Sequence, residues 1–296
     1  MNLTPLASCP LCGGGRIRPF KKGTVDPAAV GAGDFKITDS RYGSRWSLSS
    51  CRDCGFVFAD PAPDPEAIAG FYAALEDEEY GQEGEGRGRN FTAILRRLAA
   101  FAPPGSRLLD VGAASGIFLD LARAAGYSVR GIEPSASLAA EAARRYGLEL
   151  FRGTVEQYPR GETFRVVTLL DVLEHVTDPC ALMAALSPLL EPGGVLVIVT
   201  PDVGSLAARI LGGRWWHYRT AHVNFFNRRS LRRLLARHGF EIAASRRFAW
   251  HFSAYYLATR LLPGLKGSAL QGALKKLHLR LQLFDSWEVY ARKREE

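Results

Sequence analysis

Between residues 103 and 200, short apolar segments alternate with amphipathic ones, and this alternation constrains the fold more than any other feature of the chain. Five segments rich in aliphatic and β-branched residues predict buried strands, at 107–111, 128–133, 148–151, 164–170 and 195–200. Helical spacing predicts helices between them, at 116–125, 135–146 and 180–190. Strands that alternate with helices form a parallel sheet covered on both faces, so we predict an α/β fold. Alternation at 287–291 predicts one late strand at the edge of the sheet.

The turn after the first predicted strand is rich in glycine, in the sequence Asp110-x-Gly112-x-Ala114-x-Gly116. Glycines at such a turn let the backbone approach a ligand closely, because they carry no Cβ atom. Glu133 ends the second strand, where a carboxylate can accept hydrogen bonds from both ribose hydroxyls of a nucleoside. Asp110 would repel a pyrophosphate but attract an ammonium group, which favours S-adenosylmethionine over a dinucleotide. Two alternatives stay open: a dehydrogenase, and glycines that serve only a tight turn.

Four motifs in this order resemble class I S-adenosylmethionine-dependent methyltransferases of the ubiquinone O-methyltransferase type. They are LLDVGAASGIFL, GIEPS, LLDVLEHV and LEPGGVLVIVTP, within about residues 90–245. The resemblance implies a Rossmann-like domain with a mostly parallel seven-stranded sheet.

Carried over residue by residue, the resemblance implies a cofactor site made of Asp110, Gly112, Ala114, Gly116, Glu133, Pro134, Thr154, Val155 and Asp171. The turn residues would contact the methionine part, Glu133 would hold the ribose, and Thr154 and Val155 would lie beside the adenine. Ala114 departs from the family, which has glycine at this position. We expect its methyl group to weaken or reshape the methionine pocket.

Asp171, Glu174 and His175 follow the fourth strand at spacing i, i+3, i+4, so on a helical turn their side chains share one face. Three interpretations stay open. In the first, Glu174 or His175 is a general base that removes the acceptor's proton during methyl transfer. In the second, which the resemblance implies, all three residues bind a divalent metal that lowers the pKa of an acceptor hydroxyl. In the third, Asp171 contacts the cofactor while the other two cap and brace a helix.

The segment from Trp215 to Asn227 is rich in aromatic residues and histidines, and it comes after the fifth strand. Methyltransferases of this fold often place substrate-covering loops here, and aromatic walls with a few polar groups suit a small-molecule pocket. His217 and His222 are therefore rival candidates for the general base, because an unperturbed histidine suits proton removal near neutral pH. The alternative is an aromatic core patch.

Four of the five cysteines form two pairs, Cys9-x-x-Cys12 and Cys51-x-x-Cys54. Two such pairs supply the four thiolates of a tetrahedral zinc site, and a glycine suited to a tight turn follows each pair. We expect a structural zinc ion, because the cysteines fill all four positions and leave none for water.

Bacterial methyltransferases with an N-terminal zinc-binding module also resemble this chain, and several act on nucleotide-linked sugars or in natural-product pathways. In them, tyrosines after the ribbon lie near the substrate, which makes Tyr72 and Tyr80 candidates. The sugar C-methyltransferases have a further C-terminal domain, which we do not expect here. The predicted organisation is a zinc-ribbon-like module at residues 1–60, a linker with helices at 61–104 and the methyltransferase domain at 105–296. Within the linker, helical spacing predicts helices at 66–75 and 91–101, and the glycine-rich stretch 81–89 predicts a loop between them.

The charge of the chain is unevenly distributed. Fifteen Lys or Arg but one acid lie between Val203 and Phe284, whereas the whole chain has a net charge of +8. Within this region, leucines and basic residues at about 254–284 predict a helical hairpin, with a break at Pro263-Gly264. Such a hairpin would contact a membrane surface, pack on the sheet edge or form a homo-oligomer. No apolar run reaches the roughly 18 residues that span a bilayer, so we expect a cytoplasmic protein or one peripheral to the inner face of the membrane.

The predicted function is methyl transfer from S-adenosylmethionine to a small-molecule hydroxyl group, of a sugar, a quinone-like or a lipid-linked metabolite. A nucleic-acid acceptor is disfavoured, because the fourth strand ends in LLDVLEHV and not in a motif suited to a flipped-out base. Nucleic-acid methylation and a nonenzymatic cofactor- or zinc-dependent binding role stay open as alternatives.

Overall fold

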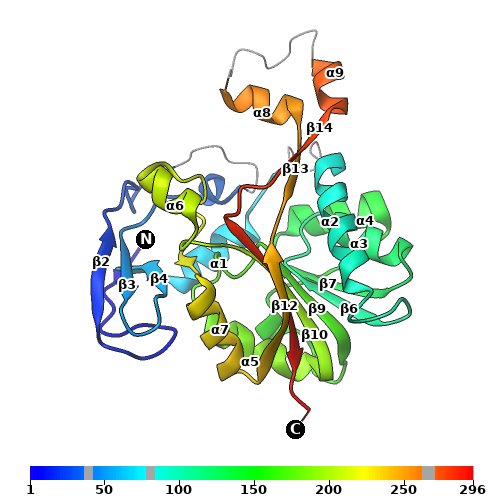
Figure 1. Cartoon of the computed structure of the whole chain (residues 1–296), viewed down its shortest axis with the longest axis horizontal. Helices are drawn as coiled ribbons and strands as arrows, with labels where there is room; N and C mark the ends of the chain where they lie inside the picture. Colours follow the sequence, from blue (N-terminus) through cyan, green and yellow to red (C-terminus); the bar gives the residue numbers. More distant parts are fainter. Residues whose placement is uncertain (37–42, 78–83, 262–270, 296) are drawn as a thin grey trace.

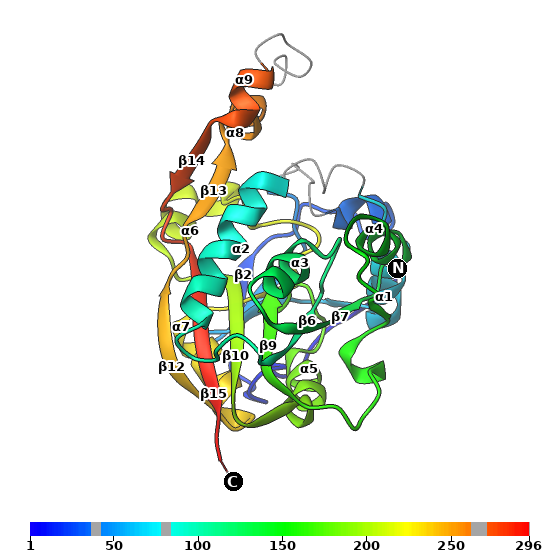
Figure 2. The same ribbon diagram turned by 90° about the vertical axis from the view of Figure 1, so that its right-hand side faces the viewer.

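The computed structural model describes residues 1–36, 43–77, 84–261 and 271–295, and its largest element is a seven-stranded sheet (Figures 1 and 2). The strands lie in the order β12-β15-β10-β9-β6-β7-β8. Their bounds are β6 Arg107–Val111, β7 Ser128–Glu133, β8 Phe151–Arg152, β9 Phe164–Leu170, β10 Leu190–Pro201, β12 Phe240–Arg247 and β15 Ser286–Lys293. Every strand is parallel to the others except β15, which is antiparallel to both of its neighbours. The prediction of a mostly parallel seven-stranded α/β sheet is confirmed.

The last strand does not lie at the edge of the sheet. β15 lies between β10 and β12, so the prediction of an edge strand at 287–291 was wrong. The edge strand is β12, which the sequence pattern does not reveal. Its residues after Phe240 are exposed or half-buried, so the strand lacks the continuous apolar run that marks the strands of the sheet interior.

Helices cover both faces of this sheet (Figure 2). One face carries α2 Gly84–Leu98, α3 Ile117–Ala124 and α4 Ala136–Tyr146, and the other carries α5 Pro179–Leu186 and α7 Arg228–Arg237. The ends of α4 follow from the sequence: the Ser135 hydroxyl accepts a hydrogen bond from the Leu138 amide, and Gly147 adopts a left-handed conformation at the C-terminus.

The helix α2 begins earlier than expected. The segment 81–89 was predicted to be a loop, yet residues 84–89 are helical, and 81–83 lie outside the described residues. An ion pair of 3.0 Å between Glu85 and Arg89, one turn apart, supports the first turn. A Cβ atom at Gly86 would lie 3.0 Å from the carbonyl oxygen of His251, so the glycine permits close helix packing here instead of ending the helix.

The N-terminal cysteine module shares its sheet with a later part of the chain. β2 Ile17–Lys21, β3 Leu48–Cys51 and β4 Val57–Ala59 pair in order, and β11 Asn224–Phe225 adds to the free side of β4. Beside this sheet, β1 Leu3–Thr4 pairs with β5 Ala62–Pro63. The helical turn η1 Ala32–Phe35 packs against α1 Pro65–Ala73. The buried cysteines belong to the same apolar cluster as residues of β9 and β10, so the module and the domain have a continuous core.

A two-stranded ribbon projects from the body of the molecule and carries two short helices (Figure 1). It consists of β13 Trp250–Ser253 and β14 His278–Leu281, with α8 Ala254–Leu261 and α9 Gln271–Lys276 between them. The predicted helical hairpin at 254–284 is therefore wrong for 278–281, because these residues pair with β13 instead. The expected break at 263–264 lies outside the described residues. None of the described helices combines the length and hydropathy needed to cross a bilayer.

The remaining short elements are η3 Val155–Gln157, η4 Ser187–Leu189, α6 Leu206–Leu211 and η5 Gly212–Arg214.

Candidate functional site

A cavity of about 430 Å³ lies at the carboxyl ends of β6, β7 and β9. Ligands bind at this edge of parallel sheets, where the loops after the strands diverge. Phe35 of η1 and Ile68 and Tyr72 of α1 line the side contributed by the N-terminal part of the chain. A second groove, of about 580 Å³, lies between α7 and the β12–β15 edge, but it contains none of the predicted site residues.

The turn between β6 and α3 brings backbone close to this cavity. Gly112 has φ 78°, and a Cβ atom there would lie 2.8 Å from Cγ2 of Val172, so no larger residue fits. Ala114 has φ 47°, a left-handed conformation that costs an L-residue about 1 to 2 kcal/mol. Glycine adopts this conformation without that cost, so glycine is the residue that the backbone favours at position 114.

Glu133 ends β7 as a buried carboxylate on the cavity wall. Its two oxygens accept hydrogen bonds from the backbone amides of Ala114 and Ser135, each at 2.8 Å. Burial outweighs these bonds and raises the pKa of Glu133 to about 7. Each carboxylate oxygen can accept a second hydrogen bond, so the group can still bind ribose hydroxyls.

Asp110 is buried within β6, and its Oδ1 accepts a 2.5 Å hydrogen bond from the Thr168 hydroxyl. Burial raises the pKa of Asp110 to about 7. Asp110 and Gly116 do not line the cavity, whereas a Cβ atom at Gly116 would lie 3.0 Å from that of Ala142, where α3 meets α4. The other expected cofactor residues line the cavity: Gly112, Ala114, Glu133, Pro134, Thr154, Val155 and Asp171.

His175 also lines the cavity, beside Tyr72. Its Nδ1 atom lies 2.6 Å from the Tyr72 hydroxyl and 3.1 Å from the carbonyl oxygen of Ala221. Because a carbonyl oxygen only accepts, this geometry assigns the proton to Nδ1 and leaves the lone pair on Nε2. Burial, with the nearby Arg219 charge, lowers the pKa of His175 to about 3, so the ring is neutral at pH 7. Burial also raises the pKa of Tyr72, which stays protonated.

Glu174 and His222 lie behind His175 and do not line the cavity. The Glu174 carboxyl accepts a 2.9 Å hydrogen bond from the Thr200 hydroxyl, and burial raises its pKa well above the ordinary value. The His222 ring lies 4.6 Å from the His175 ring, and burial lowers the pKa of His222.

The predicted metal trio of Asp171, Glu174 and His175 does not form. Among the described residues, Glu174 and His175 cluster with His222 instead, with ligand atoms within 4.8 Å of one another. The chain makes a turn here and not the expected helix, and Asp171 has φ 57° at its start. Asp171 lines the cavity, and burial raises its pKa to about 6.

His217 does not line the cavity, and its ring lies 6.0 Å from that of His222. Its Nε2 atom lies 3.3 Å from Oδ2 of the buried Asp285. Of the two tyrosines suggested by resemblance, Tyr72 is placed beside His175, and Tyr80 lies outside the described residues.

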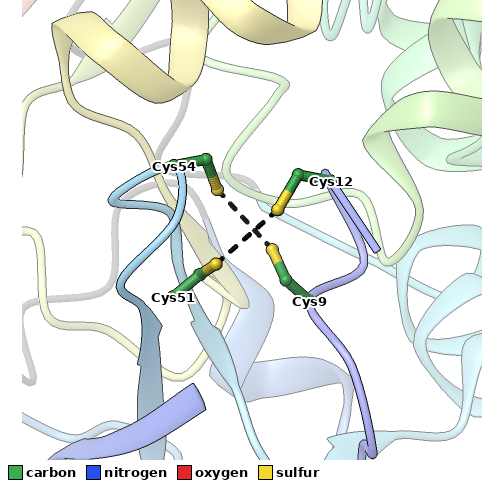
Figure 3. A group of neighbouring side chains, drawn as sticks. All are labelled: Cys9, Cys12, Cys51 and Cys54. Atoms are coloured by element: carbon green, nitrogen blue, oxygen red, sulfur yellow. Dashed lines mark hydrogen bonds between the residues drawn. The ribbon is translucent and has the colours of Figure 1, made fainter. Parts of the chain in front are cut away.

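The four paired cysteines point their sulfur atoms toward one centre (Figure 3). The Sγ atoms of Cys9 and Cys54 are 3.7 Å apart, and those of Cys12 and Cys51 are 3.6 Å apart. These separations are too long for disulfides, and they match the roughly 3.8 Å between sulfurs bound tetrahedrally at about 2.3 Å from zinc. A hydrogen bond with Cys54 lowers the pKa of the Cys9 thiol to about 5. The cluster fits a zinc module.

Sequence reasoning missed two parts of the site. The carbonyl oxygen of Ala221 fixes the His175 ring, but a backbone acceptor leaves no signal in the residue types. Phe35 and Ile68 line the cavity from segments that precede the first strand of the large sheet by more than thirty residues. Only the resemblance to zinc-module methyltransferases indicated that this part of the chain reaches the site.

Solved structures support the fold. A SAM-dependent methyltransferase from Methanosarcina mazei superposes with a TM-score of 0.50 at 18% identity, covering 68% of this chain and 98% of that protein. The [4+2]-cyclase SpnF superposes with a TM-score of 0.50 at 20% identity, covering 77% and 90%. Since this fold also occurs in a cyclase, it does not by itself determine the reaction.

Curated relatives are similar over a shorter stretch. The ubiquinone biosynthesis O-methyltransferase of Bradyrhizobium sp. (strain ORS 278) is 31% identical over 128 residues, which cover 40% of this chain and 51% of the relative. That of Cereibacter sphaeroides (strain ATCC 17029 / ATH 2.4.9) is 36% identical over 132 residues, covering 40% and 52%. The chain therefore spans about half the length of the curated relatives it matches. Residues 84–245, more than half of the chain, match the family model described as a methyltransferase domain. The chain belongs to this methyltransferase-domain family.

Proposed function

We propose that the chain transfers a methyl group from S-adenosylmethionine to a hydroxyl group of a small molecule. One observation carries the proposal: a single cavity is lined both by Gly112 and Glu133, which suit a nucleoside, and by the neutral Tyr72–His175 pair. The relatives that the chain resembles act in ubiquinone biosynthesis as O-methyltransferases, which is consistent with a hydroxyl acceptor.

The residues of the cavity fit S-adenosylmethionine. Glu133 has free acceptor capacity for the ribose, and Ile132, Leu138 and Val155 provide apolar surface for the adenine. Asp171 lines the cavity as a further carboxylate, which suits a positively charged methionine group. When bound, the cofactor supplies an electrophilic methyl group on a sulfonium centre.

His175 is the candidate general base in this mechanism. As the new carbon–oxygen bond forms, the acceptor hydroxyl loses its proton, and the Nε2 lone pair of His175 takes it. Tyr72 and the Ala221 carbonyl hold the ring from the other side, so Nε2 keeps its orientation. We assign Glu174, His217 and His222 to supporting roles, because none of them lines the cavity.

The proposal is tested with methyl-labelled S-adenosylmethionine and three acceptor pools: hydroxylated quinones and phenols, sugars, and lipid-linked glycans. We expect label in one small-molecule pool, and a rate of labelling lower by about 10² to 10⁴-fold with His175→Gln. Label in added RNA or DNA, or none in any pool although S-adenosylhomocysteine binds, would contradict the proposal.

We also propose that the chain contacts an anionic membrane surface at its periphery. In α6, Leu206 is 67% exposed and Ile210 is 74% exposed, and the exposed Arg209 lies between them. Next to β14, Leu277 and Phe284 are 54% and 59% exposed, and Arg280 is exposed nearby. Apolar side chains interleaved with basic ones suit the interface of an anionic bilayer.

Vesicle flotation tests this contact. We expect the chain to float with phosphatidylglycerol vesicles more than with phosphatidylcholine vesicles, and Ile210→Ser with Leu206→Ser to abolish the difference. Equal flotation with both kinds of vesicle would contradict this contact. If light scattering then shows a dimer that the two serine substitutions dissociate, the surface binds a second copy of the chain instead.

A further inference from the structure

The chain between α6 and α7 passes from the active-site side of the cavity to the cysteine module. We call residues 213–227 the acceptor-side segment, because its Ala221 carbonyl contacts His175 and Tyr72. The segment also returns to the turn that carries His175, since the amides of Val223 and Asn224 both donate to the carbonyl oxygen of Glu174, at 2.9 and 3.1 Å. The position of this segment therefore fixes the Nδ1 side of His175.

The cysteine module also forms hydrogen bonds with this segment. The Ala59 amide donates to the Val223 carbonyl at 2.8 Å, and β11 then continues along β4, with Phe58 opposite Asn224. At the start of α7, the Asn227 side-chain amide donates to the carbonyl oxygen of Gly55 at 2.6 Å.

A second set of contacts lies nearer to Ala221. The indole nitrogen of the buried Trp46 donates to the Thr220 carbonyl at 2.7 Å, and the Gly43 amide donates to the Tyr218 carbonyl at 2.9 Å. The segment is thus held on both sides of Ala221 by residues 43–59 of the module.

The cysteine centre closes the hairpin that makes these contacts. Cys51 ends β3, and its amide donates to the Phe56 carbonyl at 2.9 Å, while Cys54 lies three residues before β4 begins. The pair Cys9 and Cys12 is attached to α7 instead. The Arg237 guanidinium of that helix donates to the carbonyl oxygen of Leu11, which lies between the two cysteines, at 2.9 Å. A metal bound by all four thiolates joins these two anchors and fixes the register between β4 and β11.

We propose that the four-cysteine centre is a positioning device for the acceptor side of the cavity: its metal holds the acceptor-side segment, which holds the His175 ring. The inference deepens the proposed function and rests on it in one respect, namely that His175 faces the acceptor. The residues expected to hold the cofactor, Gly112, Glu133 and Val155, lie at the ends of β6 and β7 and after β8, and none of them belongs to residues 43–59.

The experiment compares zinc-loaded chain, chain stripped of metal by a chelator, and stripped chain reloaded with zinc or cadmium. Amide exchange is measured by NMR, together with the imidazole nitrogen signals of His175, which His175→Gln identifies. We expect metal removal to speed exchange of the Val223 and Asn224 amides about tenfold or more and to shift the His175 Nδ1 signal. Cadmium, which also binds four thiolates tetrahedrally, should restore both. S-adenosylhomocysteine affinity should change less than about threefold.

A variant separates this coupling from unfolding of the module. Trp46→Phe keeps the cysteines and removes the donor to Thr220, so it should retain zinc, speed exchange near Ala221 and shift the His175 signal. Trp287→Phe is the matched control, because its buried indole nitrogen has no partner among the described residues and lies on β15. The inference would be overturned if amide exchange at residues 218–224 and the imidazole nitrogen signals of His175 stayed unchanged both in the chain stripped of metal and in Trp46→Phe. A zinc-loaded chain that fails to bind S-adenosylhomocysteine contradicts the proposed function alone, because these readouts need no ligand.

Discussion

The hydroxyl oxygen of Tyr72 lies 2.6 Å from Nδ1 of His175, although the two residues are separated by 103 positions in the chain. Tyr72 belongs to α1, which precedes every strand of the large sheet in the sequence. His175 belongs to the turn after β9. Their contact joins the N-terminal part of the chain to the chemistry proposed for the cavity. The functional unit therefore includes α1 and does not begin at the first strand of the sheet.

The first prediction concerns this pair. His175→Gln removes the proposed base and should lower the rate of methyl transfer by about 10² to 10⁴-fold. Tyr72→Phe removes one hydrogen-bond partner of the His175 ring and should lower the rate of methyl transfer about tenfold. Both rates are measured as S-adenosylhomocysteine formed with an identified acceptor, and the affinity for S-adenosylhomocysteine should not change.

The control for these variants is His238→Gln, because His238 ends α7 and does not line the cavity. This variant should keep full turnover. Full turnover in His175→Gln as well would show that His175 is not the base.

The second prediction concerns Ala114 and its φ of 47°. Ala114→Gly relieves a left-handed alanine and should raise the free energy of unfolding by about 1 kcal/mol. Ala113→Gly is the matched control: Ala113 is buried and has no positive φ, so this change should lower stability by about 1 kcal/mol. Urea unfolding measures both, and equal losses in the two variants would exclude strain at Ala114.

The third prediction follows from the pKa of Glu133, which burial raises to about 7 in the free chain. Ribose hydroxyls donate to the ionised carboxylate, so binding favours the charged form and releases a proton where Glu133 is protonated. Affinity for S-adenosylhomocysteine should therefore be constant above pH 7 and fall by up to about tenfold per pH unit below it. Calorimetry from pH 5.5 to 8.5 checks this dependence.

Two variants assign the titrating group. Glu133→Gln should bind more weakly at pH 8 and lose the fall in affinity that begins near pH 7, so that only a fall below about pH 6, from Asp171, remains. Asp110 is the competing candidate, because its pKa is also about 7. Asp110→Asn should keep the pH dependence near pH 7, because Asp110 does not line the cavity. The opposite pattern would transfer the role to Asp110.

Much of the fold could be predicted because its strands are buried on both faces. β6, β9 and β10 are rich in aliphatic residues and mostly buried, and the glycine at 147 marks the end of α4, so local patterns identify these elements. β11 has two residues and β12 is half-exposed, so neither has a pattern of its own. Their places are set by pairing with β4 and β15, which are distant in the sequence.

The candidate site was predictable to a similar extent. The glycine-rich turn and the acid at the end of β7 could be located from the sequence, because their positions relative to the strands are local properties, and Gly112, Ala114 and Glu133 line one cavity. The spacing of Asp171, Glu174 and His175 suggested a shared helical face, but the chain turns at Asp171 and brings His222 to the other two instead. No local pattern encodes a contact between His175 and His222, which are 47 residues apart.

The fourth prediction concerns the metal content. We expect about one zinc ion per chain by mass spectrometry of metals, and Cys54→Ser should lose it and unfold at a lower temperature. Cys180→Ser is the control, since Cys180 lies outside the four-sulfur cluster and should retain zinc. Equal zinc content in Cys54→Ser and the unaltered chain would exclude the proposed ligand set.

The central claim is that the cavity between Glu133 and His175 binds the methyl donor. Isothermal titration with S-adenosylhomocysteine tests it most directly, with NADH as the competing nucleotide and Glu133→Ala as the site variant. We predict saturable one-to-one binding of S-adenosylhomocysteine, at least about tenfold weaker binding in Glu133→Ala, and no binding of NADH. Tight binding of NADH, or no heat with either S-adenosylmethionine or its demethylated product while the chain stays folded, would contradict the account.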